Sequence, residues 1–127
     1  MFNKKNKQQQ SDIDQQEIST LIGEGYTITG EIQGPSVIRI EGKIIGDVNV
    51  EGGVVLGENG NIEGNITTKS AVIYGTVNGN VKTTHLEIKK SGHINGDIIT
   101  DTLEVELGAK YNGRLSMQPQ QILKEAS

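Results

Sequence analysis

The chain reads Gly75-Thr76-Val77-Asn78-Gly79-Asn80-Val81 at residues 75–81, and this pattern recurs along it. The unit is Gly, any residue, Ile or Val, any residue, Gly, any residue and a further apolar residue, with other full copies at 42–48, 60–66 and 92–98. Partial copies stand at 30–34 and 109–115. The second glycines fall at 34, 46, 64, 79, 96 and 113, so the period is near 16 or 17 residues after a first interval of 12. Such a period indicates a repeat architecture in which similar units stack.

Short alternating apolar segments between the copies are candidates for further strands. They occupy residues 37–40, 54–56, 72–74, 86–88 and 103–107. Isoleucine and valine total 26 of the 127 residues, against 7 leucines, and β-branched side chains favour strands. Each period therefore holds about three short strands.

Two all-β architectures could use this pattern. Asn-Gly pairs at 59–60, 78–79, 95–96 and 112–113 are typical of tight hairpins and would fit an antiparallel meander. We favour a parallel β-helix, because the runs around these pairs are too short for hairpin strands. A coil of about 17 residues at roughly 3.3 Å each closes around three short sides. The sequence thus predicts a solenoid of about six coils, with Ile and Val inside and glycine at the corners supplying positive φ.

Glycine also divides the chain into a body and two tails. All 17 glycines lie between Gly23 and Gly113. We expect a disordered N-terminal leader over residues 1–19, the β-helix domain over 20–117 and a flexible C-terminal tail over 118–127.

The composition argues against several classes of function. The absence of cysteine excludes disulfides and thiol chemistry, and a net charge of −4 argues against general nucleic-acid binding. No phosphate-binding loop occurs, since Gly42-Lys43 is followed by Ile44. His85 and His93 are eight positions apart, which places them on different sides of a coil, and Glu104 and Glu106 read as a solvated outer face. We therefore expect no catalytic residue, metal, cofactor or nucleotide.

The two ends of a β-helix are open unless they are capped. Open ends expose unpaired backbone groups and apolar coil interiors, and they favour end-to-end stacking. We predict a polymerisation interface whose residues are Ile28, Ile32, Val37 and Ile40 at one end and Tyr111, Leu115 and Met117 at the other. The alternative is a monomer whose tails fold over its ends.

The start of the chain combines two apolar residues with three lysines. Met1, Phe2, Lys4, Lys5 and Lys7 are candidate membrane-binding residues, because each lysine near an anionic surface contributes about 1 kcal/mol and apolar side chains insert into the interface. The same lysines would also fit a leader that only aids solubility. No apolar window is long enough to span a bilayer and no secretory signal is evident, so a cytoplasmic location is expected.

Taken together, these stretches resemble the bactofilins, a bacterial family of polymer-forming cytoskeletal proteins. The matching segments are 21–25 with 27–32, 38–46, the central Gly-x-Val-x-Gly-Asn-Val copies and 108–113. The resemblance implies a right-handed, roughly triangular β-helix that polymerises without nucleotide by joining like ends. It also implies flexible tails and, in many members, an N-terminal membrane-targeting peptide of the form Met-Phe-x-Lys, which Met1-Phe2-Asn3-Lys4 matches. Tyr111 stands where the family often has phenylalanine.

The expected function is that of a bacterial cytoskeletal scaffold and not of an enzyme. Its partners would be further copies of itself, anionic lipids at the inner face of the cytoplasmic membrane, and cell-wall or envelope enzymes that it organises; nucleic acid is not expected. Such a scaffold would serve cell shape or envelope modification. The alternative is a non-polymerising β-helical binding module that recruits a partner through one face.

Overall fold

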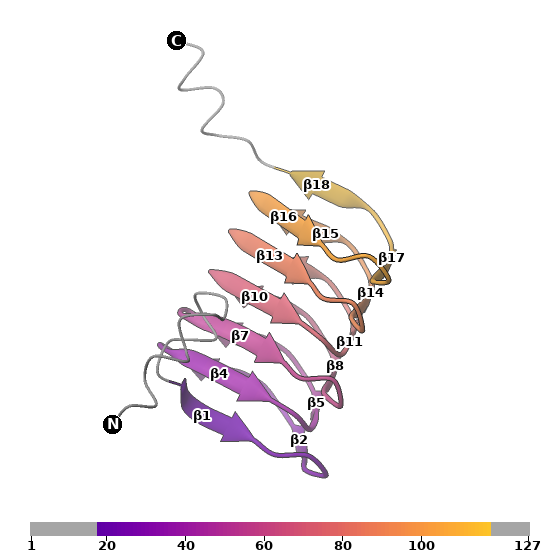
Figure 1. Ribbon diagram of the computed structural model, residues 1–127. Helices are drawn as coiled ribbons and strands as arrows, with labels where there is room; N and C mark the ends of the chain where they lie inside the picture. Colours follow the sequence, from indigo (N-terminus) through magenta and orange to yellow (C-terminus); the bar gives the residue numbers. More distant parts are fainter. Residues whose placement is uncertain (1–17, 118–127) are drawn as a thin grey trace, which may run out of the picture.

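The computed structural model describes residues 18–117, where eighteen short strands wind into a solenoid (Figure 1). The first wall contains β1 (Ile18–Ile22), β4 (Val37–Ile40), β7 (Gly53–Leu56), β10 (Ser70–Ile73), β13 (His85–Ile88) and β16 (Thr102–Val105). The second contains β2 (Thr27–Thr29), β5 (Lys43–Ile45), β8 (Asn61–Glu63), β11 (Thr76–Asn78), β14 (His93–Asn95) and β17 (Lys110–Asn112). The third contains β3 (Ile32–Gly34), β6 (Val48–Val50), β9 (Ile66–Thr68), β12 (Val81–Lys82), β15 (Ile98–Thr100) and β18 (Leu115–Met117).

Strand direction decides between the two architectures that the sequence left open. Within each wall every strand pairs in parallel with the strand one coil away, as β11 does with β8 and β14. Asn78 and Gly79 form a corner between two walls, because β11 ends at Asn78 and β12 begins at Val81. The predicted parallel β-helix of about six coils is therefore confirmed, and the antiparallel meander is wrong.

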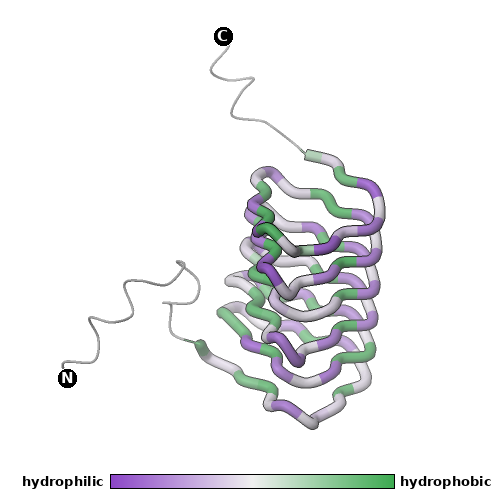
Figure 2. Tube along the Cα trace, turned by 45° about the vertical axis from the view of Figure 1, so that its right-hand side comes forward, coloured by the Kyte–Doolittle hydropathy of each residue, from purple (hydrophilic) through white to green (hydrophobic). Residues whose placement is uncertain are grey.

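The core consists of columns of β-branched side chains inside the three walls. In the second wall Ile44, Ile62, Val77 and Ile94 lie directly above one another, and each is 0% exposed. Figure 2 shows apolar and polar stretches alternating along the successive coils. Burial of a coil's inward side chains thus depends on the coils above and below it, so the solenoid is stabilised by stacking.

The corner glycines align in one column, and this column corrects the register of the first copy. Gly46 stacks on Gly30, not on Gly34, which pairs with Val50. Gly30 has φ of +128°, in line with the positive φ of the later corner glycines. The corner glycine of the first coil is therefore Gly30, and its interval to Gly46 is 16 residues. The 12-residue interval arose because the sequence pattern takes Gly34, four residues later, as the corner glycine.

The predicted tails lie almost wholly outside the described residues. Strand β1 begins at Ile18, two residues before the predicted start of the domain at Thr20. The candidate membrane-binding residues and the predicted C-terminal tail lie outside the described range, so their assignment stays a prediction.

Candidate functional site: the two ends of the solenoid

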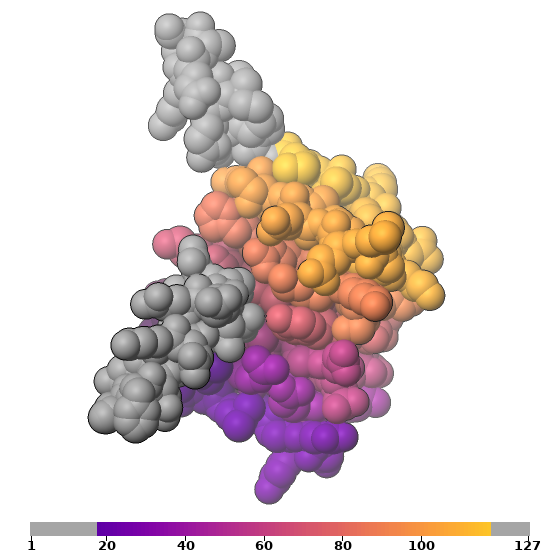
Figure 3. Space-filling view, viewed as in Figure 1, coloured from indigo at the N-terminus to yellow at the C-terminus, as the bar shows by residue number. Residues whose placement is uncertain are grey.

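The C-terminal coil exposes apolar side chains that belong to inward-facing columns. Val105, Leu115 and Met117 are 51%, 42% and 43% exposed. Their counterparts one coil earlier, Ile88, Ile98 and Thr100, are at most 1% exposed because the last coil covers them. Within the described residues no strand covers the last coil in turn, because β16, β17 and β18 are the terminal strands of their sheets. Figure 3 shows this coil, in orange and yellow, at one end of the molecule. Among residues 18–117 the solenoid therefore ends in an apolar surface at β16, β17 and β18 that no other described strand covers.

Tyr111 continues the inward column of the second wall in this last coil. It pairs with Ile94 and packs against the core, half-buried. Its hydroxyl oxygen is buried and has no hydrogen-bond partner among the described residues, although it lies near the backbone of Ile98. Burial, and next the nearby Asp97 carboxylate, raise the pKa of Tyr111, so the hydroxyl stays protonated at neutral pH. The ring thus sits at the margin of the C-terminal surface with an unused donor.

The N-terminal end differs from the prediction in two residues. Ile28 and Ile32 are half-buried on the first coil, as an end position requires. Val37 and Ile40 are only 3% and 0% exposed. Strand β1 precedes β4 in the first wall, with Ile18 paired with Val37 and Ile22 with Ile40, so β4 is not the end strand of that wall. Placing Val37 and Ile40 on the end surface was therefore wrong, because the segment before Gly23 forms a strand of its own.

The two end coils also differ in charge. Residues 18–34 contain Glu24 and Glu31 and no lysine or arginine. Residues 102–117 contain Glu104 and Glu106 together with Lys110 and Arg114, so both signs are present. Two N-terminal ends would bring only like charges together, whereas two C-terminal ends can pair opposite ones.

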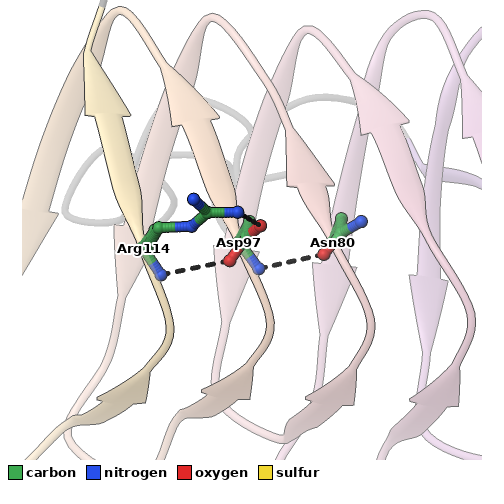
Figure 4. Close-up of polar contacts among 3 residues, drawn as sticks. All are labelled: Asn80, Asp97 and Arg114. Atoms are coloured by element: carbon green, nitrogen blue, oxygen red, sulfur yellow. Dashed lines mark hydrogen bonds and ion pairs between the residues drawn. The ribbon is translucent and has the colours of Figure 1, made fainter.

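A ladder of polar side chains runs along the corner that follows the glycine column. Asn80 Oδ1 accepts the backbone N–H of Asp97 at 2.9 Å, and Asp97 Oδ1 accepts that of Arg114 at 3.2 Å (Figure 4). Contacts of 2.9 Å join the earlier coils in the same way, from Asp47 to Asn65 and from Asn65 to Asn80. Arg114 instead turns its guanidinium back to Asp97, with Nη2 3.4 Å from Oδ2. Because arginine has no acceptor atom, the ladder stops at the last coil.

The remaining candidate residues fall on the outer faces. His85 and His93 lie on β13 and β14, in different walls, as predicted, and His85 Nδ1 is 2.7 Å from Thr102 Oγ1. Glu104 and Glu106 are exposed, as predicted. In residues 18–117 no group of His, Cys, Asp and Glu side chains is arranged to hold a metal ion. The same part of the chain contains no helix long and apolar enough to cross a membrane.

Sequence reasoning missed Val105 as a member of the end surface. Its segment, 103–107, reads as a solvated strand because of the two glutamates that flank it. Alternation alone places Val105 on the inner face, and its position in the last full period is the signal that could have identified it. Leu103, which is half-buried against the core, lies in the neighbouring inward column.

Comparison with known proteins relates this geometry to one family. The sequence model of the family described as "Bactofilin: Polymer-forming cytoskeletal" matches residues 20–116. Bactofilin BacP of Myxococcus xanthus (strain DK1622) is 25% identical over 100 residues, which cover 78% of this chain and 42% of that protein. The chain therefore aligns with less than half the length of this relative.

Two solved structures share the fold over nearly their whole length. The cryo-EM reconstruction of Thermus thermophilus bactofilin double helical filaments is 28% identical, with a TM-score of 0.76, and the match covers 78% of this chain and 99% of that one. The solid-state NMR structure of the cytoskeletal bactofilin BacA is 27% identical, with a TM-score of 0.73 and coverage of 80% and 98%.

Proposed function

The chain belongs to the bactofilin family of polymer-forming cytoskeletal proteins, and we propose that it assembles into filaments by end-to-end stacking of its solenoid, without nucleotide. The observation that carries this proposal is the open C-terminal surface, where Val105, Leu115 and Met117 stay exposed while their counterparts one coil earlier are covered. A second copy placed on this surface would complete the stacking that every interior coil already has. The Thermus thermophilus relative forms double helical filaments, which supports assembly of this chain into filaments.

We place the stronger contact between two C-terminal ends. Three features support this choice: the apolar exposure is greatest there, both charge signs are present there, and the corner ladder stops at Arg114. In a head-to-tail contact, the Arg114 guanidinium would lie against the first corner of the next copy. Because a guanidinium has no acceptor atom, it could not accept a hydrogen bond from the backbone there and so could not continue the ladder. Joining like ends gives a filament in which successive subunits alternate in direction.

The filament would be a structural scaffold and not an enzyme. It would lie in the cytoplasm against the inner face of the cytoplasmic membrane, where residues 1–7 of many subunits contact anionic lipid. A single leader with Phe2 and three lysines binds weakly, but a filament that presents many leaders binds firmly through effective concentration. Such a scaffold would organise cell shape or envelope-modifying enzymes.

Negative-stain electron microscopy of the purified protein without nucleotide tests the assembly. We expect long thin filaments, both from the full chain and from a variant that lacks residues 1–17 and so keeps β1 intact. Monomers or dimers at all concentrations in both samples would contradict the proposal, and they would favour a discrete β-helical binding module.

Co-sedimentation with liposomes tests the membrane contact. Replacing Phe2 with alanine, or Lys4, Lys5 and Lys7 together with glutamine, is expected to abolish binding of filaments to vesicles that contain anionic lipid. The reason is that the weak contribution of each leader is multiplied along the filament. Gln8→Ala is the matched control in the same segment and should bind like the wild type. Undiminished binding of both variants, with filaments intact, would show that the leader is not the anchor.

A further inference from the structure

The C-terminal surface of the solenoid is a ramp and not a flat face. Each coil advances the chain by one strand, as from β13 to β16 in the first wall, and neighbouring strands lie about 4.8 Å apart. The three last strands, β16, β17 and β18, therefore rise in sequence by about 1.6 Å per wall. Where β18 of the third wall ends beside β16 of the first, the surface drops by one strand spacing. We call this corner the step.

Two copies that join through these surfaces are related by a twofold axis perpendicular to the solenoid. The rotation reverses the chain direction, so strands of the two copies meet antiparallel. Three walls can be laid on three walls in three ways, and in each way the axis passes through one corner and through the middle of the opposite wall. The two walls beside that corner are exchanged, and the opposite wall meets itself. The joint therefore has three possible rotational registers.

The ramp is complementary to itself in only one of these registers. When the axis passes through the step, the low first wall of each copy meets the high third wall of the other, and the second wall meets itself at middle height. The summed height is then equal at all three walls, so all three can close together. In either other register the sums differ by one strand spacing, which leaves a gap of about 4.8 Å at one or two walls. Such a gap leaves apolar side chains of the end coil uncovered.

We infer that the C-terminal joint uses the register with its axis through the step, an inference that rests on the end-to-end assembly proposed above. Tyr111, the middle residue of β17, then lies on the axis and faces its own equivalent in the second copy. Val105 faces Leu115 across the joint, and Leu103 faces Met117, each pair occurring twice by symmetry. The apolar side chains of the two end surfaces thus meet one another.

The charges of the last coil agree with this register. Exchange of the other two corners brings Arg114 of each copy beside Glu106 of the other, so two pairs of opposite charge form. Both side chains are exposed in the single copy, Arg114 at 90% and Glu106 at 54%. An axis through the corner at Gly113 would instead set Arg114 against its own equivalent, which brings like charges together.

Single cysteines test the register, because the chain contains none. Opposite residues of an antiparallel pair have Cα atoms about 5 Å apart, which suits a disulfide. Tyr111→Cys places its thiol on the axis and should form covalent dimers with itself under mild oxidation. Glu104→Cys and Ser116→Cys lie outside the apolar columns and face each other across the joint. Each alone should run as a monomer on a non-reducing gel, whereas an equimolar mixture refolded together should give several-fold more dimer.

The other cross-linking patterns would overturn the inference. Dimers of Ser116→Cys alone would place the axis through the middle of the third wall, and dimers of Glu104→Cys alone would place it through the middle of the first. Filaments without disulfides, both from Tyr111→Cys and from the mixture, would mean that the ends do not meet in this way. The mixture keeps the test independent of any effect of losing the Tyr111 ring. Absence of filaments from the parent chain would refute the assembly itself, so the two failures are distinguishable.

Discussion

Replacing Gly96 with alanine is expected to destabilise the solenoid strongly. Gly96 has φ of +151°, a conformation that residues with a side chain rarely adopt. A Cβ atom at this position would collide with the backbone carbonyl oxygen of Gly79 and would lie 2.6 Å from its carbonyl carbon. Since backbone is in the way, no side-chain movement can relieve the clash. We expect a loss of at least about 3 kcal/mol in the free energy of unfolding, a large part of a small domain's total.

Gly34→Ala is the matched control for this substitution. Gly34 lies at the end of β3, has no positive φ, and a Cβ there would meet no atom within 4 Å. Its unfolding free energy should stay unchanged or rise by about 0.5 kcal/mol, because alanine reduces the entropy of the unfolded chain. Urea unfolding followed by circular dichroism measures both variants. Equal midpoints for Gly96→Ala and the wild type would mean that the corner column tolerates a side chain.

The architecture could be predicted from the sequence because two independent periods agree. Alternation of apolar residues defines which side chains face inward, and the repeat near 17 residues places equivalent positions such as Val77 and Ile94 above each other. In a parallel solenoid, every coil fits both the alternation along its strands and the repeat of about 17 residues. A hairpin meander satisfies only the Asn-Gly pairs, and these serve as corners.

The register of the first coil could not be predicted in the same way. Residues 30–34 contain two glycines around Ile32, so the local pattern fits the repeat unit in the wrong frame. Only the stacking of Ile28 on Ile44 and of Ile32 on Val48 fixes the frame, and this is a long-range contact. Placing Val37 and Ile40 on the N-terminal end surface was a separate error, because the segment before Gly23 forms β1, which precedes β4 in the first wall.

Two further features depend on neighbours that a single repeat does not reveal. Thr100 faces the core and is 0% exposed, and its hydroxyl accepts a hydrogen bond of 3.0 Å from Thr83 of the previous coil. A threonine in isolation reads as a surface residue, but here a polar partner lies one coil away. From the sequence alone, Val55 and Val72 could face either the solvent or the core. In the structure they belong to a buried cluster that is separate from the main core.

Leu115→Asp is expected to stop filament growth while the solenoid stays folded. The Leu115 side chain is 42% exposed in the isolated chain, so a carboxylate there can remain hydrated. In a contact between two C-terminal ends, the same carboxylate would lose water. We expect a cost of about 3 kcal/mol or more, which corresponds to roughly a hundredfold weaker association. Electron microscopy and sedimentation should then detect species no larger than dimers, joined through their N-terminal ends.

Ser116→Asp distinguishes the end contact from a general effect of added charge. Ser116 is the next residue on β18, is exposed, and pairs with the outward-facing Ile99, so its side chain points away from the stacking surface. The charge change and the strand are the same as for Leu115→Asp, and only the direction of the side chain differs. Ser116→Asp should therefore form filaments of normal length. Normal filaments from Leu115→Asp as well, and from Tyr111→Arg, would move the contact away from the C-terminal coil.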